Sequence, residues 1–92
     1  MELDVQRNDH QYFAVVDGHM AHLDFVAVRP HVLDFQHTKV PPELRGRGVA
    51  DALVRHALDD AKERGFEVIP TCPFVRAFLD RNPEYRTMTV AS

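Results

Sequence analysis

The sequence predicts a small α/β domain with a mixed sheet, in which antiparallel N-terminal strands lead into a β-α-β-α unit. β-prone runs fill residues 11–40, an amphipathic helical pattern covers residues 42–64, and a shorter strand and helix follow. Strand, helix and strand in this order favour a parallel crossover, whereas strands joined by a tight turn are antiparallel neighbours. The 92 residues are expected to form one domain, 1–92, without a linker or repeat.

The first strands flank the dipeptide Asp17-Gly18, which is a strong hairpin signal between β-prone runs. Apolar and polar side chains alternate over residues 22–27, which gives the second strand of the hairpin one buried face. The segment ELDV, residues 2–5, is a candidate for a further short strand. The break at Arg29-Pro30 separates the hairpin from the next strand.

The next expected strand is VLDFQHTKV, residues 32–40, and it ends at Pro41 and Pro42, which cannot donate to a ladder. Strict alternation would divide its side chains between two faces. The two sets are Leu33, Phe35 and His37 on one face, and Asp34, Gln36 and Thr38 on the other.

Residues 42–64 are expected to form the first helix, which Gly65 ends. FEVIP, residues 66–70, reads as a short buried strand. The second helix is expected over residues 73–82, since proline suits a first helical position and Asn82-Pro83 is a stop. The tail from residue 84 is either a short strand or a loose end. The apolar side chains of the two helices are Ala50, Leu53, Val54, Ala57, Leu58 and Ala61, then Phe74, Val75, Phe78 and Leu79.

Composition excludes several function classes. The chain is 45% hydrophobic and 27% charged, as in soluble domains, and its net charge of −3 argues against a general nucleic-acid binder. Its polar start is unlike a signal peptide, and no apolar run approaches the roughly 20 residues of a membrane span. One cysteine allows no internal disulfide and fits a reducing compartment, so we expect a cytoplasmic location. We expect no metal site, because His19 and His22 point to opposite faces of a strand and no C-x-x-C pattern exists.

Charge is uneven along the chain. Residues 1–40 carry six acidic and three basic side chains, whereas residues 41–92 carry eight of each. An acidic surface of this kind either attracts a cationic substrate or is an ordinary solvated face.

The stretch RGRGVA, residues 45–50, stands between a strand and a helix. The first turn of a helix has amides without internal partners and a partial positive charge, so it is a ready anion site. Glycines let a ligand approach the backbone, and Arg45 and Arg47 add charge suited to phosphate. The alternative is a flexible surface turn that happens to carry arginines. The stretch matches neither the Walker A nor the G-x-G-x-x-G pattern.

The same stretch resembles the R/Q-x-x-G-x-G/A signature of the GNAT acetyltransferases, with Arg45, Gly48 and Ala50 at the fixed positions. Two longer segments are similar to a branch of short, single-domain GNAT-like proteins. They are HTKVPPELRGRGVADALV, residues 37–54, and VIPTCPFVRAFLDRNPEY, residues 68–85. The resemblance covers residues 33–86 by sequence and 11–28 by pattern. It implies a minimal GNAT-like fold that binds acetyl-coenzyme A.

By this resemblance, the amides of residues 45–50 hold the cofactor's pyrophosphate and the pantetheine arm lies along residues 37–40. A backbone N–H near Val40 would polarise the thioester carbonyl. Asn82 and Arg81 either reach the adenosine or pantetheine, or simply cap the second helix in solvent. The implied cofactor contacts are Thr38, Val40, Arg45, Gly46, Arg47, Gly48, Val49, Ala50 and Asn82.

The chain departs from typical GNAT proteins, which are longer. The helices expected after the first strand are absent, and the C-terminal strands that wall the acceptor site are missing or vestigial. An open site suits a small-molecule, peptide or protein amine, or completion by a second subunit, so the chain is expected to be a monomer or homodimer. The resemblance implies an N-acetyltransferase; the alternative is a non-catalytic module that binds coenzyme A or a partner protein.

Two residues are candidates for the chemistry. His37 lies near the expected thioester, and an imidazole can accept a proton near neutral pH; the alternative is a packed histidine. Cys72 precedes a helix, where a thiol can be activated, or it is simply packed. Direct transfer from coenzyme A is preferred to an acyl-cysteine route. Glu43 as a base through water and Tyr85 as an acid are further candidates.

Overall fold

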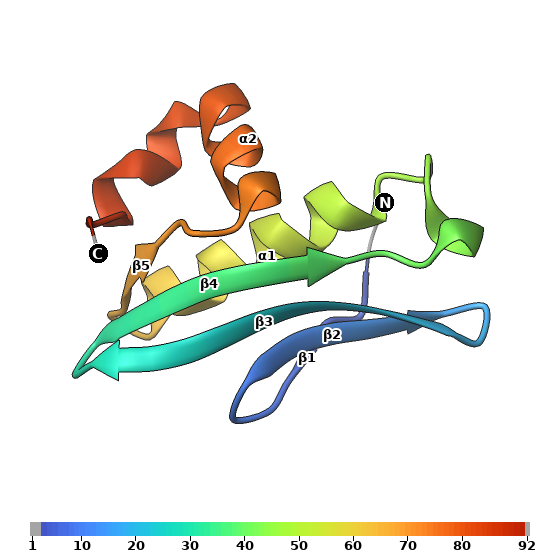
Figure 1. Cartoon of the computed structure of the whole chain (residues 1–92), viewed down its shortest axis with the longest axis horizontal. Helices are drawn as coiled ribbons and strands as arrows, with labels where there is room; N and C mark the ends of the chain where they lie inside the picture. The colour runs from blue at the N-terminus through green and yellow to red at the C-terminus, as the bar shows by residue number, and fades with distance from the viewer. Residues whose placement is uncertain (1–2, 92) are drawn as a thin grey trace.

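The computed structural model describes residues 3–91, which contain a five-stranded sheet and two α-helices (Figure 1). Two short 3-10 helices, η1 and η2, lie among them. In chain order the elements are β1 (Gln6–Arg7), β2 (Gln11–Val16), β3 (His19–Arg29), β4 (Val32–Lys39), η1 (Pro42–Leu44), α1 (Val49–Glu63), β5 (Glu67–Ile69), α2 (Pro73–Arg81) and η2 (Pro83–Met88).

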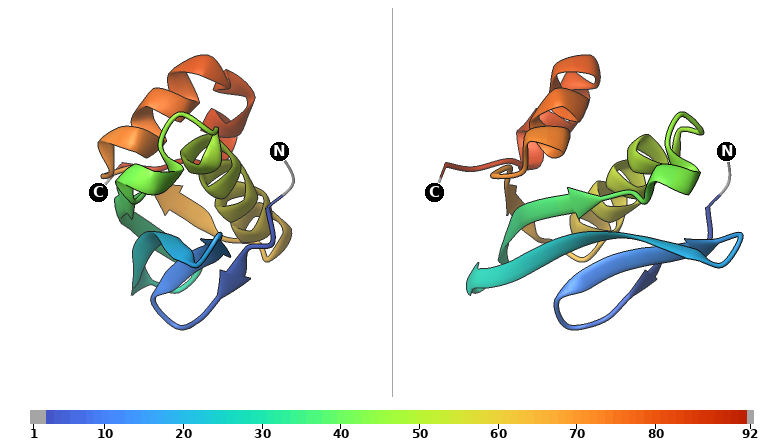
Figure 2. Two further views of the ribbon diagram at one scale, coloured as in Figure 1. Left: turned by 90° about the vertical axis from the view of Figure 1, so that its right-hand side faces the viewer. Right: turned by 45° about the vertical axis from the view of Figure 1, so that its right-hand side comes forward.

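The strand order in the sheet is β1-β2-β3-β4-β5, antiparallel except for the parallel pair of β4 and β5. This confirms the predicted mixed sheet and the parallel crossover through α1. The sheet twists around α1, which packs on β2, β3 and β5, while α2 packs beside α1 and touches β4 (Figure 2). The first hairpin turns at Asp17 and Gly18, as predicted, and both have positive φ angles.

A β-bulge in β4 overturns the predicted division of its faces. Asp24 pairs with His37 and Phe25 with Phe35, so Gln36 is an extra residue on β4. An extra residue reverses the alternation beyond it. Phe35 is therefore buried while His37 is exposed, and Thr38 is buried in its place. The prediction that His37 shares a face with Leu33 and Phe35 was wrong.

The first helix begins later than predicted. α1 begins at Val49 rather than at residue 42, and η1 and a turn occupy the intervening segment. Gly46 and Gly48 have φ angles of 77° and 76°, which no right-handed helix contains. The helix ends as predicted before Gly65, whose φ is 78° and whose N–H donates to the carbonyl of Lys62.

The ends of the chain also differ from the prediction. The short N-terminal strand is Gln6–Arg7, whereas residues 3–5 are not a strand and Glu2 lies outside the described residues. The tail forms η2 and then a single bridge between Thr89 and Val68 of β5. The strand predicted over residues 66–70 and the helix predicted over 73–82 are present as β5 and α2, with slightly narrower bounds.

One core lies between α1, α2 and the sheet. Tyr12 is fully buried, and its ring centroid lies 5.3 Å from that of Phe25 and 5.9 Å from that of Phe35. The predicted apolar face of α1 packs on these rings, but Ala50 is only half-buried. In α2, Phe74 is 48% exposed, so its predicted place in the apolar stripe was wrong. The buried members of that stripe are Val75, Phe78 and Leu79.

The Tyr12 hydroxyl is a polar group at the edge of this core, and its partner is the Asp60 carboxylate. It donates to Asp60 Oδ2 at 2.8 Å, and Arg7 Nε and Arg64 Nη1 approach the same oxygen at 3.1 and 3.4 Å. Burial raises the pKa of Tyr12, and the neighbouring Asp60 raises it further. Burial also acts to raise the pKa of Asp60, but the Tyr12 hydrogen bond and the two arginines outweigh it and hold that pKa below its usual value.

Tyr12→Phe is expected to destabilise the protein by about 1.5–3 kcal/mol at pH 7, because a hydrogen bond to a charged group is lost. A carboxyl whose pKa is lowered by folding contributes stability above its unfolded pKa and loses it as pH falls through the folded pKa. The cost of the substitution should therefore shrink at about pH 2. Urea unfolding of both proteins at the two pH values checks this; an equal cost at both would contradict the assignment of the effect to a hydrogen bond with the charged Asp60 carboxylate.

Candidate functional site

The turn before α1 contains backbone amides that the described part of the protein leaves without acceptors. Gly46 and Gly48 are left-handed, and Gly48 caps the 15-residue helix without a side-chain hydrogen bond. Within residues 3–91, the N–H groups from Gly46 to Asp51 have no hydrogen-bond acceptor in the protein. When residues with right-handed and left-handed backbone conformations alternate, successive N–H groups point into one concavity that suits an anion. The predicted anion loop is thus a turn of six free donors at a helix N-terminus.

The two arginines of this turn point to different partners. Arg45 Nε donates to the carbonyl oxygen of Val40 at 3.3 Å, and Arg45 lines the neighbouring cleft. Arg47 Nη1 instead lies 2.9 Å from Asp17 Oδ2 in the β2–β3 turn, and Arg47 does not line the cleft. Arg47 therefore ties the loop to the hairpin, and Arg45 is the arginine at the cleft.

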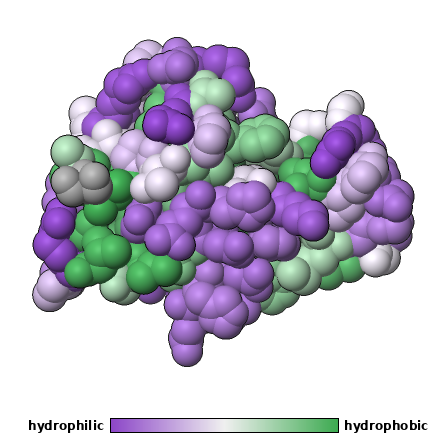
Figure 3. Space-filling view, viewed as in Figure 1, coloured by the Kyte–Doolittle hydropathy of each residue, from purple (hydrophilic) through white to green (hydrophobic). Residues whose placement is uncertain are grey.

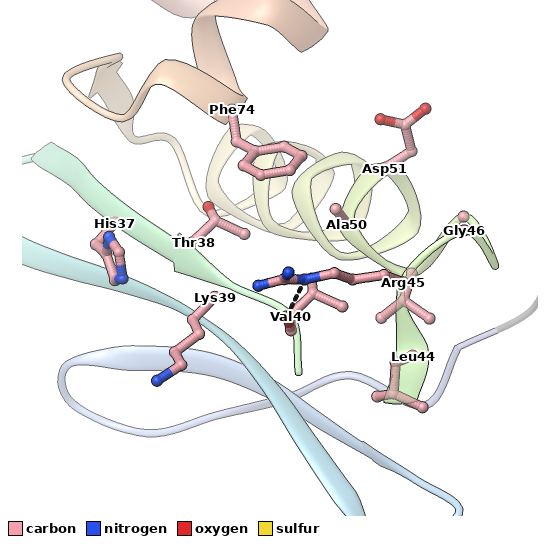
Figure 4. A pocket seen from close by; sticks show the side chains of 12 residues that line it. His37, Thr38, Lys39, Val40, Leu44, Arg45, Gly46, Ala50, Asp51 and Phe74 are labelled. Carbon is pink, nitrogen blue, oxygen red and sulfur yellow. Dashed lines mark hydrogen bonds between the residues drawn. The ribbon is translucent and has the colours of Figure 1, made fainter. Parts of the chain in front are cut away.

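The cleft beside this turn has a volume of about 740 Å³ (Figure 4). It lies between the end of β4, the turn and the first residues of α1, and the Phe74 ring of α2 closes one side. Such a volume suits a ligand of cofactor size. Its lining residues are His37, Thr38, Lys39, Val40, Leu44, Arg45, Gly46, Gly48, Val49, Ala50, Asp51 and Phe74.

β4 and β5 separate next to the cleft. Their pairing ends at Asp34 and Ile69, after which the N–H of Cys72 donates to the carbonyl of Phe35. In the described part of the chain, residues 36–40 have no strand partner on the side away from β3. This open edge leads along β4 toward the loop amides, so an extended ligand group can follow it.

Comparisons with known proteins identify the family. A model described as GCN5-related N-acetyl-transferase matches residues 11–88. The chain belongs to this family. Acetyl transfer is the general activity that the family is named for.

The chain is also similar to several individual proteins. Protein NATD1 of Bos taurus and of Homo sapiens are 39% and 38% identical over 56 residues, which are 61% of this chain and 50% of each relative. The chain thus matches about half the length of these relatives. A GCN5-like protein from Staphylococcus aureus, solved by NMR, has a TM-score of 0.74 and 22% identity over 98% of this chain and 90% of that one. This likeness supports the same fold.

Most of the cofactor contacts implied by the resemblance lie together. Seven of the nine line the cleft, and the exceptions are Arg47, directed to Asp17, and Asn82. Asn82 Oδ1 accepts from Arg55 Nη2 at 3.0 Å, and its Nδ2 donates to the carbonyl of Phe78. Asn82 therefore caps α2 and binds α1, and it does not line the cleft. The seven are Thr38, Val40, Arg45, Gly46, Gly48, Val49 and Ala50.

The two chemical candidates have different surroundings. His37 is exposed and lines the cleft, so it is not the packed histidine that its expected face implied. Cys72 is 2% exposed and does not line the cleft; its Sγ lies 3.3 Å from Thr38 Oγ1, which does. Thr38 thus separates the thiol from the cleft.

The remaining candidates are engaged elsewhere. Glu43 Oε1 lies 3.8 Å from His19 Nδ1. The Tyr85 hydroxyl donates to Asp59, and its pKa is raised by burial and by that carboxylate. Within residues 3–91 no three His, Cys, Asp or Glu side chains gather as a metal site, and no helix is long and apolar enough to cross a membrane.

Sequence reasoning missed three residues that line the cleft, Leu44, Asp51 and Phe74. Leu44 and Asp51 are neighbours of the recognised motif, so their proximity was available from the sequence. Phe74 was assigned to the core, although the buried residues Val75, Phe78 and Leu79 already complete a helical stripe without it. An aromatic side chain outside the buried stripe, such as Phe74, was therefore the sequence signal that could have placed it at the cleft.

Proposed function

We propose that this chain binds acetyl-coenzyme A in the cleft and transfers the acetyl group to an amine. The observation that carries the proposal is the run of six acceptor-free amides, Gly46–Asp51, at the start of α1, since every residue of the run except Arg47 lines the cleft. Such amides favour a dianionic pyrophosphate, and Arg45 adds a fixed positive charge beside them.

The thioester arm would lie along the open edge of β4 from Val40 toward His37. Pro41 and Pro42 have no N–H, so Val40 is the last residue of the strand edge with an N–H before the two prolines. An N–H there would stabilise charge on the thioester oxygen, as in an oxyanion hole. Phe74 would cover the arm and exclude water.

In the proposed reaction an amine attacks the thioester carbon. The C–N bond forms and the C–S bond breaks. His37 takes one proton from the ammonium form of the acceptor, which leaves a neutral amine with a lone pair for attack, and a second proton on that nitrogen goes to the departing thiolate once the C–N bond has formed. His37 fits this role by its position on the cleft wall and its exposure.

Turnover is tested by incubating the protein with acetyl-coenzyme A and an amine panel and detecting the acetylated amine by mass spectrometry. Release of free thiol should accompany it, and heat-inactivated protein is the control. Tight binding without any acetylated product would instead favour a non-catalytic coenzyme A-binding module. One observation favours that alternative: among the described residues, the outer edge of β5 pairs only through the Val68–Thr89 bridge, so no C-terminal strands wall the acceptor side.

Cys72→Ala is expected to retain turnover, because the thiol is buried behind Thr38 and transfer is direct. The small cavity should cost about 1 kcal/mol of stability. Steady-state rates and intact-mass spectra check this together. Loss of turnover in a folded variant, with acetyl on Cys72 of the wild type, would contradict direct transfer and establish an acyl-cysteine route.

A further inference from the structure

A polar cluster lies on the face of β3 and β4 that points away from α1. Leu23 and Thr38 are register partners and both are buried, so their neighbours along each strand point to the opposite face. Those neighbours include the polar cluster, which we define as His22, Asp24 and His37. The ring centroids of the two histidines lie 6.4 Å apart. Figure 3 shows a band of hydrophilic side chains over β3 and β4 in the view of Figure 1.

Asp24 is held by only one of its oxygens. Its Oδ1 accepts from His22 Nδ1 at 2.8 Å and from Gln11 Nε2 of β2 at 3.1 Å. Its Oδ2 has no hydrogen bond from residues 3–91, and the side chain is 37% exposed. Two fixed donors on one oxygen orient the carboxylate and leave the other oxygen available to a ligand.

The available oxygen belongs to the direct neighbour of His37. Asp24 and His37 are register partners, and the bulge at Gln36 is what turns His37 to this face. Directly opposite residues of antiparallel strands have Cβ atoms about 4.5–5.5 Å apart. The other side chains facing the cluster across the strands are Phe13 of β2 and Lys39 of β4, both paired with His22 rather than with Asp24.

Charge differs between the two ends of the proposed site. Arg45 and the loop amides lie at one end of the cleft, where a phosphate would bind, and His37 lines it nearer the middle of β4. The Asp24 carboxylate lies beside His37 on the neighbouring strand β3, outside the cleft lining itself. Aliphatic amines in water near neutral pH are mostly ammonium ions, which a carboxylate binds favourably and which need a base to become nucleophilic.

We propose that Asp24 receives the ammonium group of the acceptor and so selects cationic primary amines. This inference rests on the proposed acetyl transfer. Asp24 binds one N–H of the ammonium through Oδ2, His22 and Gln11 hold Asp24 in place, and His37 accepts the proton whose loss frees the lone pair. His22 is a positioning residue, and Asp24 determines specificity.

Asp24→Asn tests the inference, because the amide oxygen can keep both hydrogen bonds while the charge is lost. The probes are Nα-acetyl-lysine methylamide, a cationic amine, and p-anisidine, an amine that is uncharged near neutral pH. With the first, KM should rise about tenfold or more. With p-anisidine, KM should change less than about twofold, which no general loss of structure would produce.

Asp34→Asn is the matched control. Asp34 is a carboxylate of the neighbouring strand β4, but its oxygens are engaged by Thr71 and Gln36. Its variant should leave the KM of both amines unchanged. Equal effects of Asp24→Asn on the two amines, or no effect on either, would overturn the assignment.

A binding experiment tests the acceptor site even if the protein transfers no acetyl group. The lysine methylamide is titrated into the protein saturated with coenzyme A, and the amide NMR signals are followed. Shifts at Asp24 and His37 that disappear in Asp24→Asn would support the acceptor site even if the wild type acetylates neither probe. Absence of those shifts in the wild type would overturn it.

Discussion

Gly48→Val is expected to remove the stabilisation that coenzyme A gives the protein while leaving the fold in place. Gly48 has a φ of 76°, and a Cβ built there meets no atom within 4 Å. The added side chain would therefore occupy the open volume above the loop, where the pyrophosphate is proposed to lie. A valine in the left-handed region adds backbone strain of roughly 1–3 kcal/mol, so the loop amides should also shift.

The effect should be large. At a ligand concentration about 100 times Kd, a one-site ligand stabilises its protein by about 2.7 kcal/mol, which raises the Tm of a domain this small by about 10–20 °C. Gly48→Val should show almost none of this rise.

Gly65→Val is the matched control for that experiment. Gly65 ends α1 with a φ of 78° and also has nothing within 4 Å of an added Cβ, but it does not line the cleft. Its variant should lose a similar amount of intrinsic stability and keep the full rise with coenzyme A. If Gly48→Val kept the rise as well, the loop would not be the pyrophosphate site.

His37→Gln is expected to lower kcat by about 100- to 10,000-fold, the usual contribution of a general base. The Kd for coenzyme A should stay within about twofold, because the proposed phosphate contacts lie elsewhere in the cleft. Stability should hardly change, since His37 is exposed. Single-turnover rates and a binding titration measure the two quantities separately. Unchanged kcat would remove His37 from the mechanism, and a parallel loss of binding would make it a cofactor contact instead.

The parts of the fold set by local chemistry were predictable from the sequence. Asp17 and Gly18 can both adopt the left-handed conformation that a tight hairpin needs, and the turn lies there. The Gly65 helix stop and the proline that opens α2 follow from the same kind of argument. Because the strand end, the loop and the first turn of α1 are contiguous in sequence, most of the cleft was predictable as well.

What depended on pairing and packing was not predictable. The bulge at Gln36 exists only as a mismatch between β3 and β4, so the alternation within β4 gave His37 the wrong face. The position of Asp24 beside His37 depends on the same register. Cys72 contacts Thr38, and Phe74 reaches the cleft, only because α2 packs on β4. Cys72 and Thr38 are 34 residues apart in the sequence, so no local pattern indicates their contact. Similarly, the interaction of Arg47 with Asp17 spans 30 residues, and no motif identifies it.

The central claim is that the amides before α1 hold the pyrophosphate of acetyl-coenzyme A. Titration of acetyl-coenzyme A into the isotopically labelled wild-type protein, followed through its amide NMR signals, tests it most directly. The largest shifts should fall on Gly46–Asp51, with a second group along residues 36–40 of β4 and its end. Saturable shifts confined to other surfaces, or no shifts at millimolar ligand, would contradict the claim.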